Sequence, residues 1–325
     1  MPDIVVMFFV LGVVAGVVRS DLSIPKAAYD ILSLLLMLTI GLKGGMALHG
    51  SLSLSLLIEL AGVTLLGIVI PLIIFPVVHY LVRLSIADSA SLAAHYGSVS
   101  AGTFAVALAY TEAHNLITGG QVTLYLVLLE LPAIMLGLLL YRRFSRKDTP
   151  GTTPELNQTS APIKTSGLWH ETLTNRGVIL LVGGVLIGWL YGPDAGESVT
   201  GLYTKAFHGI LALFLLEMGL VAAETLRSLR WGHSRLIIFA LTAPIVLSCF
   251  GLGMAYWLGL PAGSAVILAS LTASASYIAA PVAIRAAIPE ANIGLAMLAS
   301  LGLTFPFNVL IGIPLYHHLW EWLAG

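Results

Sequence analysis

The stretch GSVSAGTFAVAL, residues 97–108, lies within an apolar segment long enough to cross a membrane, yet its centre holds two serines, two glycines and a threonine. A second stretch, SASYIAAPVAI at residues 274–284, interrupts another apolar segment in the same way and adds a proline. Backbone that leaves the helix within lipid persists only where protein, water or a ligand satisfies its polar groups. The two stretches therefore predict two broken membrane helices that cross inside the protein.

The composition of the whole chain is that of a membrane protein. Its 325 residues are 58% hydrophobic and only 10% charged, and the mean hydropathy is +0.96, whereas a soluble domain carries about 25% charged residues. A net charge of −1 and the lack of a basic stripe give no sign of nucleic acid as a partner. The single cysteine, Cys249, excludes a disulfide framework. We therefore expect an all-α polytopic membrane protein surrounded by lipid.

Ten segments have the length and apolarity of a membrane-spanning helix, which needs about 20 mostly apolar residues. A polar segment rich in Thr, Ser and Pro interrupts the series at residues 143–175. We therefore predict residues 1–142 as a first five-helix repeat, 143–175 as a cytoplasmic linker and 176–325 as a second five-helix repeat. The ten predicted spans are roughly residues 3–19, 27–48, 53–82, 89–113, 118–142, 176–192, 202–224, 233–258, 263–287 and 291–318.

The basic residues predict the orientation of these spans. With the linker in the cytoplasm, all but two of the 15 Lys and Arg residues lie on the cytoplasmic side, as the positive-inside rule predicts. The two exceptions are Lys43 and Lys205. Both termini would then be extracytoplasmic, in a protein of the cell inner (plasma) membrane. Because each half has an odd number of spans, the second half would be inverted relative to the first.

Three pairs of similar motifs occur in the same order in the two halves and support an inverted repeat. The pairs are residues 37–53 with 215–230, 97–108 with 272–284, and 129–141 with 303–316. Inverted repeats with helices broken at matching positions are typical of secondary transporters, which bind substrate and coupling ions near the bilayer midplane.

The residues of the broken stretches suit a small anion and a cation. Two opposed half-helix N-termini form a positive pocket for an anion, and the hydroxyls and freed carbonyls suit Na⁺. A single small-residue stretch is better explained by helix packing, but two symmetric stretches favour a site. Glu130, well inside its span, is a further candidate because intramembrane ionisable residues are functional by default. Glu59 and Glu217 are weaker candidates, and Asn308 is expected to satisfy freed backbone.

The motifs also resemble those of the sodium-dependent bicarbonate transporters of the SbtA type found in cyanobacteria. The resemblance covers nearly the whole chain outside the linker and rests on IGLKGG (40–45), GSVSAGTFAVAL (97–108), LELPA (129–133) and SASYIAAPVAIRAAIP (274–289). It implies a homotrimer of protomers with a gate domain and a core domain, an elevator-like movement, and a PII-like regulatory protein on the cytoplasmic face. Tyr277 departs from the family pattern, which has an aspartate there.

The resemblance also implies the site residues. Bicarbonate would lie between the two broken helices with Na⁺ beside it. The implied substrate-binding residues are Ser98, Ser100, Gly102, Thr103, Ser274, Ser276, Tyr277, Ile278 and Ala279. The candidate sodium ligands are Ser98, Thr103, Glu130 and Ser276.

We therefore expect a Na⁺ symporter that imports bicarbonate, with Na⁺ as the coupling ion and no enzymatic activity. One alternative is a Na⁺-coupled symporter of another small organic anion, or a cation/proton exchanger. An intramembrane enzyme would need a nucleophile–base or metal constellation within the spans, and no such motif occurs in the sequence. A third alternative is a non-transporting membrane sensor or scaffold of the same fold that recruits a partner through the linker.

Overall fold

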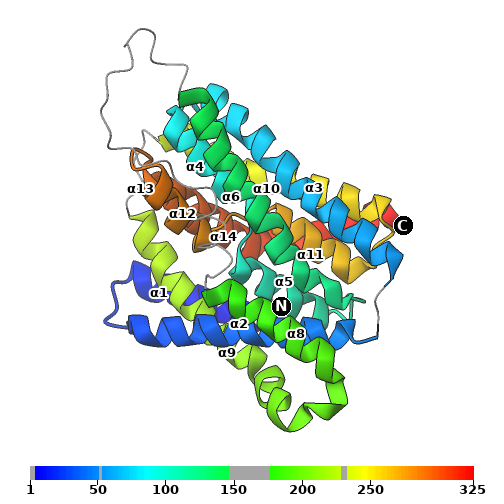
Figure 1. The fold of residues 1–325 in the computed structure, drawn as a ribbon. Coiled ribbons are helices and arrows are strands. Elements are labelled where there is room, and N and C mark those ends of the chain that lie inside the picture. Colours follow the sequence, from blue (N-terminus) through cyan, green and yellow to red (C-terminus); the bar gives the residue numbers. More distant parts are fainter. Residues whose placement is uncertain (1–3, 51–52, 146–175, 228–232) are drawn as a thin grey trace, which may run out of the picture.

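The regular structure of the described chain is entirely helical (Figure 1). The computed structural model describes residues 4–50, 53–145, 176–227 and 233–325, and no β-strand occurs among them. Eight helical segments within these ranges are long and apolar enough to cross a membrane. The prediction of an all-α polytopic membrane protein is confirmed.

The eight long segments coincide with eight of the ten predicted spans. The other two predicted spans, 3–19 and 263–287, contain only shorter apolar helices. Residues 146–175 of the predicted linker lie outside the described residues, and residues 143–145 continue the preceding helix. The long segments are Lys26–Leu48, Leu54–Val82, Ile86–Ala113, Gly120–Ser145, Arg176–Ala195, Glu197–Leu226, Ser234–Trp257 and Ile293–Ala324.

The helices are numbered along the chain as in Figure 1. In the first half they are α1 (Ile4–Val17), α2 (Lys26–Leu48), α3 (Leu54–Pro76), the π-helix η1 (Val77–Val82), α4 (Ile86–Gly97), α5 (Ala101–Ala113), the 3₁₀-helix η2 (Gly120–Thr123) and α6 (Leu124–Ser145). In the second half they are α8 (Arg176–Ala195), α9 (Glu197–Leu226), α10 (Ser234–Trp257), α11 (Ala262–Thr272), α12 (Ala279–Ala287) and α13 (Ile293–Met297). The C-terminal run continues with η4 (Leu298–Thr304), α14 (Phe305–Phe307), η5 (Asn308–Gly312) and α15 (Ile313–Ala324).

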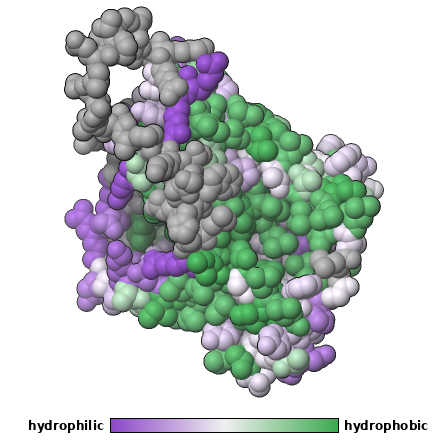
Figure 2. All heavy atoms as spheres, in the orientation of Figure 1, coloured by the Kyte–Doolittle hydropathy of each residue, from purple (hydrophilic) through white to green (hydrophobic). Residues whose placement is uncertain are grey.

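The outer faces of the long helices are apolar. Leu54 is 75% exposed and Leu190 is 63% exposed, and Figure 2 shows a broad hydrophobic surface across the middle of the molecule, with hydrophilic residues at its left and upper edges and a smaller group at the lower right. Soluble monomers rarely expose an apolar patch of more than a few hundred Å². This surface is therefore suited to contact with lipid.

The helices α1, α2, α8 and α9 form one group, in the lower part of Figure 1. Within it α2 packs along α8, α1 packs along α9, and α2 contacts α9. Glycine permits the closest of these approaches: a Cβ atom at Gly41 of α2 would lie 2.3 Å from the Leu181 carbonyl oxygen of α8. Small residues at such crossings are the usual basis of helix packing in membranes. Lipid tails are as apolar as the side chains, so the hydrophobic effect does not favour association of the helices.

The remaining helices form a second group that carries the broken helices. Helices α3, α4 and α6 pack on one another, and α10 packs on α11 and on the C-terminal run. Residues 98–100 separate α4 from α5, and residues 273–278 separate α11 from α12. The two predicted interruptions are therefore true breaks in helical structure. Each break frees backbone groups inside the protein, and their partners define the candidate site.

Candidate functional site

The two breaks lie against each other and satisfy part of each other's backbone. The Ser100 backbone N–H donates a hydrogen bond to Ser274 Oγ at 2.9 Å. The Ser276 backbone N–H donates to the His95 carbonyl oxygen at 2.8 Å. Two segments that are far apart in the sequence are thus joined by hydrogen bonds at the centre of the fold. This contact brings the predicted serines of both stretches together.

Three of these serines have structural roles in the breaks. Ser100 Oγ accepts a hydrogen bond from the Thr103 N–H at 3.0 Å and so caps the N-terminus of α5. Ser276 Oγ accepts from the Ala280 N–H at 3.2 Å, in the first turn of α12. Ser274 Oγ donates to the Leu271 carbonyl at the end of α11, at 2.8 Å. N-terminal helix N–H groups need such acceptors, so the serine-rich sequence explains how both helices restart.

Two other hydroxyls of the first stretch have no protein partner. Ser98 Oγ and Thr103 Oγ1 are buried and make no hydrogen bond within the described part of the chain; their side chains are 1% and 0% exposed. More than nine in ten buried polar groups in proteins have a partner, and an unsatisfied one costs about 1–3 kcal/mol. A water molecule, an ion or a substrate atom at these two positions would satisfy both hydroxyls.

Tyr277 packs closely on the N-terminal turn of α5. A Cβ atom at Gly102 would lie 2.3 Å from the Tyr277 hydroxyl oxygen, so only glycine fits there without a shift. The Tyr277 hydroxyl also lies beside Ser100, although no contact there reaches good hydrogen-bond geometry. The ring makes an edge contact with Phe305, with centroids 5.3 Å apart. Tyr277 thus brings a phenol to the point where both breaks meet.

A cavity of about 190 Å³ lies against the breaks. One water molecule requires only about 10–15 Å³ on this measure, so the cavity has room for a small anion with several waters. Of the predicted site residues, six line it: Ser100, Glu130, Ser276, Tyr277, Ile278 and Ala279. Four others lie in or beside the breaks but are not part of its wall: Ser98, Gly102, Thr103 and Ser274.

The opposite wall of the cavity comes from α2 and α8, which sequence reasoning did not include. Tyr29 and Met37 of α2 and Arg176 of α8 belong to it. Arg176 also forms an ion pair with Asp30 at 2.6 Å, and the ring of Tyr29 stacks on Phe214 with centroids 5.7 Å apart. No local motif distinguishes these residues, because their position depends on how α2 and α8 pack against the breaks.

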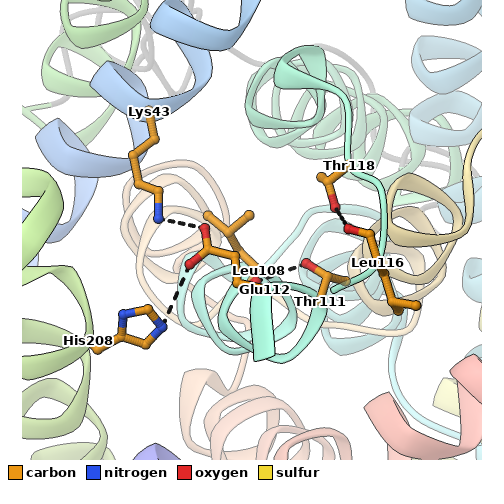
Figure 3. Close-up of polar contacts among 7 residues, drawn as sticks. All are labelled: Lys43, Leu108, Thr111, Glu112, Leu116, Thr118 and His208. Atoms are coloured by element: carbon orange, nitrogen blue, oxygen red, sulfur yellow. Dashed lines mark hydrogen bonds and ion pairs between the residues drawn. The ribbon is translucent and has the colours of Figure 1, made fainter. Parts of the chain in front are cut away.

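The far end of α5 is held by a separate charged cluster (Figure 3). Glu112 pairs with Lys43 of α2 at 2.5 Å and with His208 of α9 at 3.7 Å. The ammonium of Lys43 also lies 4.3 Å from the centre of the Phe207 ring. Glu112 is about 18 Å along the helix from Ser100, at 1.5 Å per residue. Helix α5 therefore contacts the α2–α9 group through charge at one end and adjoins the cavity at the other.

Asn308 and Glu59 are two further buried polar residues, and only Asn308 contacts a break. Asn308 Nδ2 donates to the Ala273 carbonyl at 2.9 Å, and the Tyr316 hydroxyl donates to Asn308 Oδ1 at 2.6 Å. Asn308 thus satisfies backbone at the second break, as predicted. Glu59 accepts hydrogen bonds from Tyr125 and Gln121 and does not line the cavity.

Glu217 lies apart from the breaks as well. It lines a surface pocket between α1 and α9 together with Glu224 and Arg227. Neither of the two weaker acidic candidates, Glu59 and Glu217, therefore reaches the cavity, whereas Glu130 does.

The structure combines apolar helices of membrane-spanning length, two paired helix breaks and a cavity lined by hydroxyls. This combination is typical of polytopic membrane transporters. The chain belongs to the Na⁺-dependent bicarbonate transporter superfamily, whose sequence model matches residues 4–321. The resemblance found in the motifs is thereby confirmed, and the family is one of transporters, not an enzyme class. A search of curated proteins finds no match.

Proposed function

We propose that the protein is a secondary active transporter that imports bicarbonate together with Na⁺. Membership of the superfamily supports the substrate and the coupling ion. The observation that carries the proposal is the pair of buried hydroxyls, Ser98 Oγ and Thr103 Oγ1, that lack partners where the breaks meet. A ligand atom bound beside these hydroxyls during the transport cycle would give them the partners that they lack within the described protein.

The anion is assigned to the helix starts. The N–H groups of the first turn of α5, at Ala101 and Gly102, have no acceptor in preceding turns of the same helix. The start of α12 at Ala279 faces the same cavity. Helix N-termini attract anions through these free donors and the helix dipole. The predicted substrate residues from Ser98 to Thr103 and from Ser274 to Ala279 supply these donors and their hydroxyls.

The cation is assigned to the oxygen atoms beside the anion. Ser98 and Thr103 offer unpartnered hydroxyls, Glu130 offers a carboxylate on the cavity wall, and Ser276 also lines the wall. Hard cations are bound by carboxylate, carbonyl and hydroxyl oxygens. One Na⁺ moving with one bicarbonate is electroneutral, and a second Na⁺ would add about 2.3 kcal/mol per 100 mV of membrane potential.

The proposed topology has ten membrane segments in two inverted repeats, residues 1–142 and 176–325, joined by the cytoplasmic linker. Equivalent packing in the two halves supports it. Gly41 of α2 contacts α8, and Gly219 of α9, its counterpart in the paired motifs, contacts α1. A Cβ atom at Gly219 would lie 2.3 Å from the Phe9 carbonyl oxygen. A Cβ atom at Gly41 would lie at the same distance, 2.3 Å, from the Leu181 carbonyl oxygen. Both termini are then extracytoplasmic, in the inner membrane.

The proposed movement is an elevator-like displacement of the group that carries the breaks past α1, α2, α8 and α9. The cavity lies between these two groups, and the Lys43–Glu112 ion pair also joins them. The resemblance to SbtA-type transporters supports a homotrimer and a PII-like partner on the cytoplasmic face.

The test is uptake of labelled bicarbonate into proteoliposomes, with an inward Na⁺ gradient or with K⁺ in its place. Ser98→Ala is expected to abolish Na⁺-dependent uptake, because it removes a proposed ligand of both ions. Ser248→Ala, a buried serine of α10 bonded only to its own helix, serves as the matched control and is expected to retain uptake. Folded protein without Na⁺-dependent uptake would overturn the proposal, and Na⁺-induced thermal stabilisation without flux would favour a sensor or scaffold.

A further inference from the structure

The cavity wall combines a few polar groups with a larger number of apolar side chains. The side formed by the breaks carries the hydroxyls of Ser100, Ser276 and Tyr277. The side formed by α2 and α8 carries Ser33, Tyr29 and Arg176, and it also carries four apolar residues: Leu34, Met37, Val178 and Leu181. Pockets for organic ligands have this arrangement, in which a few polar groups fix the orientation and an apolar wall receives the rest of the molecule.

Bicarbonate alone does not use such a cavity fully. Its three oxygen atoms all require hydrogen bonds, and a polar oxygen placed against Leu34 or Met37 loses water without gaining a partner. The volume of about 190 Å³ also exceeds what an ion of four heavy atoms occupies. A carboxylate with a short hydrocarbon chain matches both sides, because its head resembles bicarbonate and its tail is apolar.

The charges on the wall limit the ligand to one carboxylate. Glu130 is acidic and lines the cavity, and Arg176, the basic residue on the wall, already pairs with Asp30. Among the described residues of the wall, the proposed Na⁺ balances Glu130 and Asp30 balances Arg176, so no cation is left to pair with a second carboxylate of the ligand. An unpaired charge in a poorly solvated site is costly.

We infer that this site also takes short-chain monocarboxylates of about three to five carbons, with the carboxylate at the helix starts and the chain against α2 and α8. The inference rests on the proposed function, since it uses the same site. Each methylene buried against an apolar wall strengthens binding by about fourfold. Affinity is therefore expected to rise from acetate through propionate to butyrate, and to fall for chains that exceed the cavity.

Two measurements on the full-length protein at pH 8 test the inference. In the first, acetate, propionate, butyrate, hexanoate or succinate is added to the protein in detergent and NaCl, and the shift of the thermal unfolding midpoint is measured. The second is inhibition of labelled bicarbonate uptake by the same acids. In both measurements we expect the apparent affinity, taken from the concentration dependence, to be about tenfold or more higher for butyrate than for acetate, with little effect of succinate. Met37→Ser should reduce the butyrate-to-acetate ratio, and Met46→Ser, on the same helix but off the wall, should not.

The outcomes separate the two proposals. Bicarbonate uptake that no monocarboxylate inhibits, or inhibition that does not depend on chain length, would overturn this inference and leave the proposed function intact. A chain-length-dependent thermal shift in protein that transports no bicarbonate would support the inference and overturn bicarbonate as the substrate. The wild-type series decides the question, so a variant that fails to fold does not obscure it.

Discussion

Replacing Gly102 by alanine places a methyl group where the Tyr277 hydroxyl now lies. The added Cβ would be 2.3 Å from that oxygen, 3.1 Å from Cε1 of Phe214 and 3.2 Å from Cε2 of Phe305. All three rings are buried, so none can turn freely into solvent. The Tyr277 hydroxyl must therefore move by about 1 Å to restore ordinary contact distances.

The expected cost has two parts. Overpacking of a buried site costs about 1–3 kcal/mol, and alanine in place of glycine within a helix returns up to about 1 kcal/mol. The net loss of stability is therefore about 0–2 kcal/mol. If the Tyr277 hydroxyl donates to the substrate anion, its displacement removes a charged hydrogen bond of about 1.5–3 kcal/mol, which corresponds to a roughly 10- to 100-fold rise in KM for uptake.

The assay combines thermal unfolding in detergent with bicarbonate uptake. Tyr277→Phe removes the clashing oxygen, so the double variant Gly102→Ala, Tyr277→Phe should regain the stability that Gly102→Ala loses, with a coupling energy of about 1 kcal/mol or more. Its KM should stay high, because the phenol is absent. Gly183→Ala is the matched control: nothing lies within 4 Å of a Cβ atom there, so stability and KM should be unchanged or slightly improved.

Two results would refute this reasoning. Wild-type stability and KM in Gly102→Ala would show that the phenol does not lie against the start of α5. A destabilised Gly102→Ala that Tyr277→Phe does not rescue would show that another neighbour, such as Phe214, causes the clash.

Three further predictions concern contacts that hold the site together. Asn308→Leu leaves both the Ala273 carbonyl and the Tyr316 hydroxyl without their partner. At about 1–3 kcal/mol for each group, we expect a loss of about 2–4 kcal/mol in thermal or denaturant unfolding, and unchanged stability would contradict the role of this side chain. Ser274→Ala removes the acceptor of the Ser100 N–H and should lower both stability, by about 1–3 kcal/mol, and the uptake rate, whereas a loss of uptake at full stability would indicate direct substrate contact. Glu112→Gln weakens a partly exposed ion pair worth about 0.5–1 kcal/mol. Because this pair joins the two helix groups that enclose the cavity, the chemical modification rate of a cysteine placed in the cavity should change by about two- to fivefold. An unchanged rate would argue against a link between this pair and access to the cavity.

Much of the fold is encoded in one-dimensional features. A membrane span depends on the apolarity of consecutive residues, so eight of the ten predicted spans correspond to long apolar helices. The breaks were also predicted, because serine, glycine and proline disrupt an apolar helix locally. The two predicted spans without a long helix, 3–19 and 263–287, contain short ones. The second of these is short because the break at 273–278 divides it.

Six of the ten predicted site residues line the cavity beside the breaks. The hydroxyls of Ser100 and Ser276, the phenol of Tyr277 and the carboxylate of Glu130 do line one cavity. Ser274 instead bonds backbone within the breaks. A sequence motif identifies the types of polar group at a break, but which of them faces a cavity depends on side-chain direction and on the neighbouring helices.

The sequence by itself determined the class of protein, the location of the two breaks and the family, because each follows from local hydropathy or from short motifs. Only the tertiary structure decided that Ser100 bonds Ser274, that Met37 forms part of the cavity wall and that Glu112 pairs with Lys43. These contacts join residues far apart in the chain, and in a membrane they depend on close helix packing at small residues. Hydropathy alone does not encode that packing, since lipid-facing and buried helix faces are both largely apolar.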